Sequence, residues 1–304
     1  MTAKLETLGG RPVLRFERTV AHPPAKVWRA ITEPGHLAAW FPAEVELDLS
    51  PGATVTFTFP DQAPVDGTSS GEVIEVDPPR VFAFSWSGDV LRFELSPSGS
   101  GCLIRFSQVI GGHRSSAGRN AVGWDVCLDA LDALLDGREF EAPTAWLEPM
   151  EARIREFGLD EGSVEGNRIR FVRDLVWKPA GEVWALLVED SSPVVGGEPP
   201  ARATNAYVPV EPLTAVSPPH VLAYGPVRWE VVHDPEQGTR VEVTHDLPAG
   251  ADAATALAAW HVHLELFFAA SFGEVRCPWP AERTEELREH YARRTLRGNS
   301  CSIN

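Results

Sequence analysis

The strongest constraint on the fold is that this 304-residue chain repeats itself. Residues 123–137 read GWDVCLDALDALLDG, and residues 259–273 read AWHVHLELFFAASFG, so that Trp124 corresponds to Trp260 and Leu128 to Leu264. Three further blocks recur in the same order, namely 15–28 with 170–184, 76–84 with 216–224 and 91–95 with 227–231. Solenoid repeats are only about 20–50 residues long. The longer repeat found here predicts two copies of one globular domain.

Length and composition agree with two folded domains. A typical domain has roughly 150 residues, which is about half of this chain. The hydrophobic fraction of 43%, with 10 Trp and 14 Phe, is sufficient for two apolar cores. We expect the first domain over residues 1–158, including a connector helix, and a shortened second domain over 159–304.

Charge and cysteine spacing restrict the partners and the location that we expect. A formal net charge of −16 disfavours nucleic acids and anionic membranes, because both require a basic surface. The N-terminus has no apolar segment typical of a signal peptide. The most apolar stretch, 255–273, is interrupted by His261, His263 and Glu265, so we expect no membrane insertion. Four cysteines without a C-x-x-C pair indicate reduced thiols and a cytoplasmic protein.

The order of secondary structure predicts how each copy folds. In the first copy, proline-bounded helices at 25–32 and 35–40 follow a strand at 13–21. Six alternating segments separated by turn residues then predict strands at 44–49, 53–59, 71–76, 81–86, 90–95 and 102–109. The final helix, 120–136, has one apolar face made by Trp124, Leu128, Leu131 and Leu135. This face must be buried against the curved antiparallel sheet. The fold class predicted is α+β, with two tandem helix-grip domains.

Several motifs resemble the SRPBCC, or START-like, superfamily, whose folds include that of the birch-pollen allergen. They are the P-P-A-x-x-V-W opening, the D-P-P turn and the helix beginning G-W-x-x-x-L. Within that superfamily they are similar to bacterial relatives of the heat-shock protein 90 ATPase activator, in its C-terminal-type domain. The resemblance implies a cavity between the sheet and the long helix, where many relatives bind lipids, hormones or polyketides.

The two copies differ in a way that favours the first as the binding domain. The second copy lacks the equivalent of HLAAWF, residues 36–41, and part of the next hairpin. Its turn-rich stretch, 189–204, stands there instead. Because the missing parts help to close the cavity in the family, we expect a reduced or differently gated pocket in the second copy. The ligand-binding residues expected in the first copy are Trp40, Phe41, Phe57, Phe59, Phe82, Phe84, Phe93, Phe106, Gln108, Trp124, Leu128 and Leu131.

Polar residues near the two long helices have structural and functional interpretations. Gln108 and His245 correspond in the two copies and face inward by the parity of their strands. We favour a contact to backbone at the strand end over a hydrogen bond to a ligand. His261 and His263 point to opposite sides of a helix. His261 and Glu265 could share a metal ion, but no third ligand has suitable spacing, so no metal site is expected.

The leading functional hypothesis is non-catalytic binding of a lipid-like or polyketide-like apolar molecule, without a cofactor. The sequence has no nucleophile elbow, phosphate-binding loop or dinucleotide fingerprint. A polyketide cyclase or dehydratase is the alternative, with Gln108, Asp125 and His113 as the nearest candidates for acid or base. A co-chaperone-like ATPase activator is a further alternative, and chaperone binding and self-association stay open. We therefore assign no catalytic residue.

Overall fold

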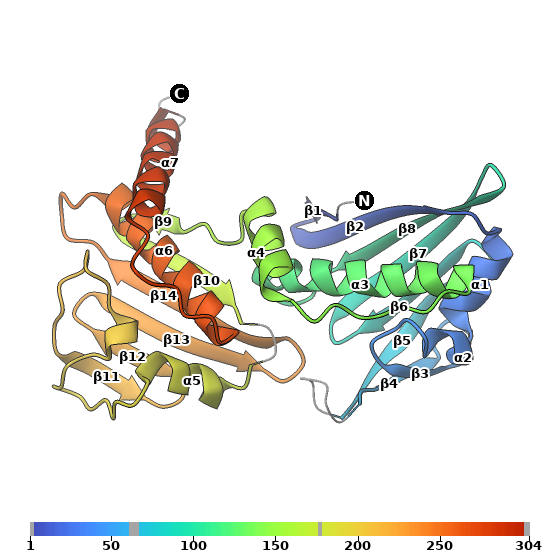
Figure 1. Ribbon diagram of the computed structural model, residues 1–304, viewed down its shortest axis with the longest axis horizontal. Helices are drawn as coiled ribbons and strands as arrows, with labels where there is room; N and C mark the ends of the chain where they lie inside the picture. Colours follow the sequence, from blue (N-terminus) through green and yellow to red (C-terminus); the bar gives the residue numbers. More distant parts are fainter. Residues whose placement is uncertain (1–2, 61–66, 176–177, 301–304) are drawn as a thin grey trace. The chain divides into compact units, whose positions relative to one another are not determined.

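The computed structural model of the protein describes residues 3–60, 67–175 and 178–300, with side chains through residue 294 (Figure 1). The chain divides into two compact units. The first comprises Met1–Phe157 with Pro235–Gln237, and the second comprises Gly158–Asp234 with Gly238–Asn304. Each unit has one antiparallel sheet and one long helix, which confirms the α+β prediction of two tandem helix-grip domains.

The first unit contains an eight-stranded sheet in the order β1-β2-β8-β7-β6-β5-β4-β3. Its strands are β1 (Lys4–Leu8), β2 (Arg11–Val20), β3 (Glu44–Leu47), β4 (Thr54–Thr58), β5 (Thr68–Asp77), β6 (Val81–Trp86), β7 (Asp89–Ser98) and β8 (Gly101–Val109). The predicted strands are present, and β1 is an addition. The strands were predictable from alternating polar and apolar residues, because one face of these strands is buried.

Four α-helices accompany this sheet among the described residues of the first unit, namely α1 (Pro24–Thr32), α2 (Pro34–Leu37), α3 (Ala117–Asp136) and α4 (Leu147–Glu156). Prolines occupy the first turn of α1 and of α2, where a missing N–H costs little. The predicted second helix is shorter than expected, because Ala38–Trp40 form a turn. The long helix α3 lies across the sheet (Figure 1). It ends at Gly137, whose φ of 69° suits glycine.

The second unit repeats this arrangement with a smaller sheet. Its order is β11-β12-β13-β14-β10-β9. The strands are β9 (Ser163–Glu165), β10 (Arg168–Asp174), β11 (Leu213–Ser217), β12 (Val221–Tyr224), β13 (Val227–Asp234) and β14 (Gly238–Asp246). The helices of the second unit are α5 (Ala180–Val188), α6 (Ala253–Ser271) and α7 (Ala281–Ser300). Each unit also has a short 3-10 turn, at Arg114–Ser116 in the first and at Ala201–Ala203 in the second. No described strand of the second unit corresponds to β3 or β4, which is the shortening that the sequence indicates.

Strand register shows that the two units are copies. Phe106 of β8 pairs with Phe93 of β7 and with Phe16 of β2. In the second unit Val243 of β14 pairs with Trp229 and with Phe171. The corresponding residues of the repeat therefore occupy corresponding places in both sheets.

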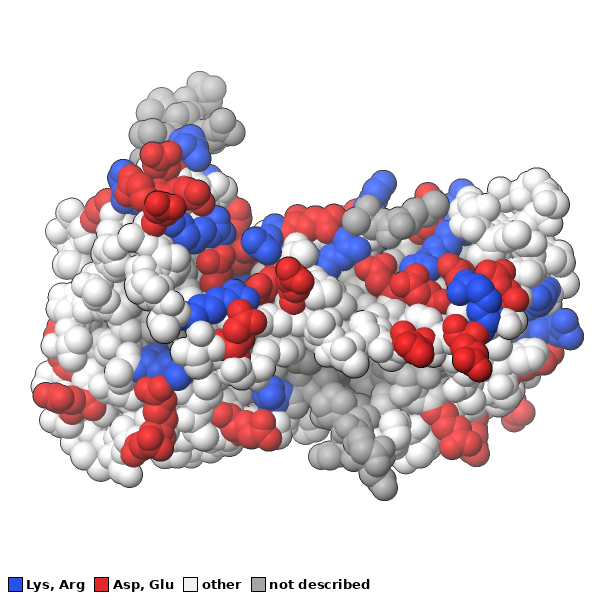
Figure 2. Space-filling model, viewed as in Figure 1, with Lys and Arg blue, Asp and Glu red and all other residues white. Residues whose placement is uncertain are grey.

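The helix α6 is the one described helix that is long and apolar enough to cross a membrane. In this fold 72% of its apolar window is buried, as is usual for the core helix of a helix-grip domain. Lys and Arg side chains lie among Asp and Glu on the face shown in Figure 2, without a continuous basic surface there.

Candidate functional site

The residues expected to bind a ligand in the first unit do come together. Strands β4, β6, β7 and β8 supply aromatic rings, and α3 supplies Trp124, Leu128 and Leu131 from the opposite side. Of the twelve residues, eleven are buried and Phe59 is half-buried. The sequence therefore predicted their common location.

In the described part of the first unit, these side chains pack against one another where the sequence predicts a ligand cavity. The Phe106 ring centroid is 4.4 Å from that of Trp124 and 4.5 Å from that of Phe93. Trp40 and Phe41, which follow α2, also pack inside, where the Trp40 indole N–H donates to the Ala30 carbonyl at 2.8 Å. A residual cavity beside Phe41 and neighbouring rings measures about 10 Å³. This is about the space of one water, so the set forms a packed core.

Gln108 has a structural role that the sequence did not identify. Its amide nitrogen donates to Asp89 Oδ2 at 2.5 Å, and its oxygen accepts from the Trp124 indole N–H at 2.9 Å. The expected backbone contact is therefore replaced by side-chain contacts. In the second unit the Trp260 indole donates to His245 Nδ1 at 3.2 Å. In both units a polar residue at the end of the last strand anchors the tryptophan of the long helix.

This anchor gives a stability prediction. Replacing Gln108 by leucine leaves the buried Trp124 N–H and an oxygen of Asp89 without these partners, which costs about 1–3 kcal/mol. Urea unfolding of Gln108→Leu, Trp124→Phe and the double variant would measure this cost. A coupling energy near zero between the two sites would contradict the anchor, because residues sharing a hydrogen bond are not additive.

The second unit contains a pocket of about 460 Å³ on the flank of α6. Its walls come from the loop that replaces β3 and β4, from α6 and from the segment before α7. The lining residues are Arg202, Thr204, Asn205, Ala206, Val210, His263, Leu266, Phe267, Ala270, Val275, Arg276 and Trp279. The sequence predicted a reduced or differently gated pocket in this copy, and the replacement loop provides one wall of the pocket described here.

Two polar side chains in this pocket have defined orientations. His263 Nε2 lies 2.9 Å from the Arg202 carbonyl, which fixes the proton on that nitrogen. Burial lowers the pKa of His263 to about 4, so the ring is neutral near pH 7. Asn205 accepts from the Tyr207 backbone N–H through Oδ1 at 3.0 Å. Its buried Nδ2 has no hydrogen-bond partner among the described residues.

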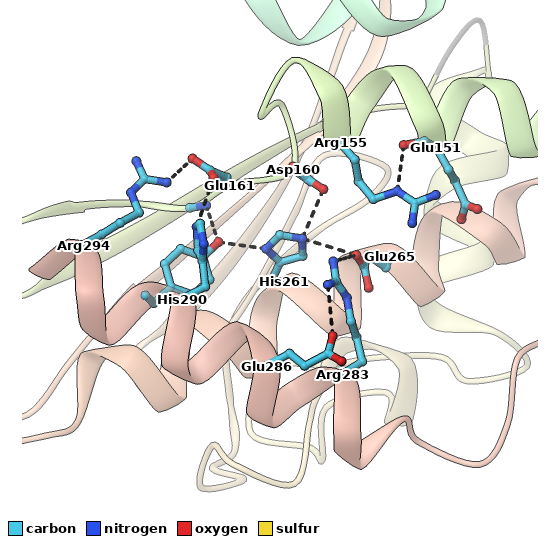
Figure 3. Close-up of polar contacts among 12 residues, drawn as sticks. Glu151, Arg155, Asp160, Glu161, His261, Glu265, Arg283, Glu286, His290 and Arg294 are labelled. Carbon is cyan, nitrogen blue, oxygen red and sulfur yellow. Dashed lines mark hydrogen bonds and ion pairs between the residues drawn. The ribbon is translucent and has the colours of Figure 1, made fainter.

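A second polar cluster lies on another face of α6, around His261 (Figure 3). His261 Nε2 is 3.3 Å from Asp160 Oδ2 and 3.4 Å from Glu265 Oε1, while Nδ1 is 2.8 Å from the Tyr291 hydroxyl. Arg283 of α7 donates to Glu265 at 2.9 Å. The cluster thus joins the chain before β9 with α6 and α7.

In this cluster, burial and the neighbouring charges shift the pKa values in opposite directions, and the charges have the larger effect. Burial disfavours the cationic form of His261, but Asp160 and Glu265 outweigh it and raise its pKa. Burial also opposes ionisation of Glu265, yet His261 and Arg283 lower its pKa to about 2. The pKa of Asp160 is lowered, again against its burial, chiefly by His261. Both carboxylates are therefore ionised at neutral pH.

Asp160 is the residue that sequence reasoning missed. The spacing of His261 and Glu265 on one helix face indicated a pair, and a third ligand was not expected. Asp160 is supplied from a distant part of the chain, where Gly162 allows close packing. A Cβ on Gly162 would lie 2.4 Å from the Phe171 ring. No local motif could have identified this contact.

Comparisons with known proteins agree with the fold of the first unit. Residues 21–136 match the family model described as activator of Hsp90 ATPase homolog 1-like protein. These residues form a domain of that family. With the second unit, which repeats its sheet order, the chain contains two tandem START-like domains. No curated protein matches the sequence significantly.

Several solved structures are similar to one such domain. A conserved protein of unknown function from Enterococcus faecalis is 17% identical, with 51% of this chain and 90% of that chain covered and a TM-score of 0.45. CalU16 from Micromonospora echinospora is 20% identical, with 52% and 94% covered and a TM-score of 0.40. A protein from Mesorhizobium loti is 26% identical, with 42% and 99% covered and a TM-score of 0.37.

Proposed function

We propose that this Hsp90 activator-like chain binds an apolar small molecule with one hydrogen-bond-accepting oxygen, in the pocket of its second unit. The observation that carries the proposal is a largely apolar pocket of about 460 Å³, lined in part by Asn205, whose buried amide nitrogen has no partner among the described residues. Small-molecule sites commonly measure about 300–1,000 Å³ and combine apolar walls with a few oriented polar groups. The location differs from the first-unit cavity that the sequence favoured, because that cavity is filled.

The walls of the pocket suit an apolar body. Leu266, Phe267 and Ala270 come from successive turns of α6, and Trp279 comes from the segment before α7. The Trp279 ring centroid is 6.3 Å from that of His263, which is neutral and therefore compatible with an apolar neighbour. Covering these surfaces with a ligand would contribute roughly 25 cal/mol for each Å² of apolar area removed from water.

The polar groups suit a single acceptor. A donor buried without a partner costs about 1–3 kcal/mol, which a carbonyl or carboxylate oxygen of a ligand would recover at Asn205 Nδ2. Arg202 lies beside it but is paired with Glu189 at 2.6 Å, which offsets much of its charge. The proposal therefore requires one accepting oxygen and does not require a formal negative charge.

Binding of lauric acid, measured by isothermal titration calorimetry, tests this proposal. Ala270→Trp fills the pocket and is expected to weaken binding at least tenfold, which corresponds to about 1.4 kcal/mol. Asn205→Asp keeps the acceptor for Tyr207 but removes the donor, so we expect a several-fold loss.

The control is Ala185→Trp, which adds the same side chain at an exposed position of α5 outside the pocket lining. It should bind the probe as the unmodified chain does. Absence of saturable binding by the unmodified chain would refute the proposal. Equal binding by Ala270→Trp would also refute it, since the probe would then lie elsewhere.

A further inference from the structure

The side chains of Asp160, His261 and Glu265 are spaced as ligands of one metal ion. Their ligand atoms all lie within 4.8 Å of one another, and His261 Nε2 is 3.3 and 3.4 Å from the two carboxylate oxygens. Zn²⁺ binds nitrogen and oxygen at about 2.0–2.2 Å in a tetrahedron, whose ligand atoms are then about 3.3–3.5 Å apart. The observed distances from Nε2 match this separation.

His261 points its free nitrogen into the cluster. The residue is 2% exposed, and Nε2 makes no hydrogen bond of normal geometry with any described residue. Figure 3 shows this nitrogen directed between Asp160 and Glu265. A buried ring nitrogen that faces two carboxyl groups at these distances is placed to share one metal ion with them.

We propose that Asp160, His261 and Glu265 bind a divalent metal ion, with Zn²⁺ the best match. One histidine and two carboxylates form a nitrogen and oxygen ligand set that suits zinc. Mg²⁺ fits less well, because it prefers six oxygen ligands and does not favour imidazole. The metal would bind directly to His261 Nε2 and to one oxygen of each carboxyl group.

Neighbouring groups support the ligands from outside. The Tyr291 hydroxyl lies 2.8 Å from His261 Nδ1 and accepts from the Gly162 backbone N–H at 3.0 Å. A metal-binding histidine usually has its second nitrogen held in this way, which fixes the ring orientation. Arg283 holds Glu265 at 2.9 Å and compensates part of the carboxylate charge when the metal is absent.

The cluster also has a side from which an ion can enter. The Glu265 side chain is 22% exposed, while those of Asp160 and His261 are nearly inaccessible. We expect solvent to supply a fourth ligand from the Glu265 side. A site with three protein ligands and one open position is typical of exchangeable or catalytic zinc. It differs in residues from the apolar pocket, so either proposal can fail without the other.

The experiment uses the full chain without an affinity tag, after treatment with a chelator and its removal. Titration calorimetry with Zn²⁺ should show one site that Asp160→Asn and Glu265→Gln weaken at least tenfold. Co²⁺ should give the visible absorption of a tetrahedral nitrogen and oxygen site, without a thiolate charge-transfer band. Zn²⁺ should also raise the melting temperature of the unmodified chain, because it binds only the folded site.

The matched control is Glu286→Gln, which removes one carboxylate beside Arg283 without touching the three ligands. It should bind Zn²⁺ as tightly as the unmodified chain. If Asp160→Asn does not fold, Glu265→Gln decides the test, because its side chain is partly exposed. The proposal is overturned if no saturable binding occurs. It is also overturned if binding is equal in Glu265→Gln, since the metal would then be held elsewhere, for example by the exposed Cys277.

Discussion

Replacing Phe106 by alanine is expected to lower the free energy of unfolding of the first unit by about 3–5 kcal/mol. Phe106 is 1% exposed. Its ring centroid lies 4.4 Å from that of Trp124, 4.5 Å from that of Phe93 and 5.5 Å from that of Phe16. The truncation removes a large apolar side chain from water-free surroundings. It also leaves a cavity between α3 and the sheet, because close-packed neighbours relax only in part.

The measurement should distinguish the two units, because a two-domain chain need not unfold in one step. Hydrogen exchange followed by mass spectrometry reports the loss of protection in β7 and β8 separately from β13 and β14. Ile74→Ala is the control, since Ile74 is 46% exposed on β5 and should cost little. A loss below about 1 kcal/mol for Phe106→Ala would show that the centre of the first unit is loosely packed.

The same variant tests whether the first unit can be turned into a binding domain. The engineered cavity would have apolar walls, and dry cavities of this type bind small apolar molecules. We expect Phe106→Ala to gain binding of benzene in the first unit, whereas in the unmodified chain the Phe106 ring occupies that space. Xenon or benzene titration followed by hydrogen exchange would locate the gain.

Replacing His261 by leucine is expected to destabilise the second unit by about 3–5 kcal/mol in the presence of a chelator. The variant leaves Asp160 and Glu265 facing each other inside the protein without the imidazolium between them. Arg283 still pairs with Glu265, at 2.9 Å. Removing one member of a buried charge cluster is costly because the remaining charges lose both solvent and partner.

Chemical unfolding with hydrogen exchange in β10 and α6 measures this loss. His290→Leu is the matched control, because His290 also pairs with a glutamate but its side chain is 41% exposed. Such a surface pair contributes about 0–1 kcal/mol. Combining His261→Leu with Asp160→Asn should cost less than the sum of the two single changes. Strict additivity would show that the two residues do not interact.

The family match and the repeat place different limits on function. Residues 21–136 match the Hsp90 activator-like family model, and the cavity beside Phe41 in this unit measures about 10 Å³. The repeat then directs attention to the second unit, where the two copies diverge. Both proposed sites use residues of that unit, and their histidines have no counterpart at the corresponding positions of the first. His261 corresponds to Asp125, and His263 to Cys127.

Sequence alone determined the duplication, the order of strands and helices, and which faces are buried. These features follow from residue alternation in strands, apolar spacing in helices and the turn chemistry between them, all of which are local. Because each motif occurs twice, the two copies could be compared position by position. The prediction that Gln108 and His245 face inward, made from alternation along their strands, is correct. Both are buried, and each contacts the tryptophan of its long helix.

Only the tertiary structure decided where free volume remains and which polar groups meet. Whether aromatic side chains enclose a cavity or fill it depends on how their volumes interlock, and Trp40 and Phe41 fill the first unit from within. The contact of Asp160 with His261 depends on packing between segments far apart in the chain. The pattern of apolar and polar residues in the sequence indicates which residues are buried. The free volume between side chains and the distances between remote segments are determined only when the whole domain packs.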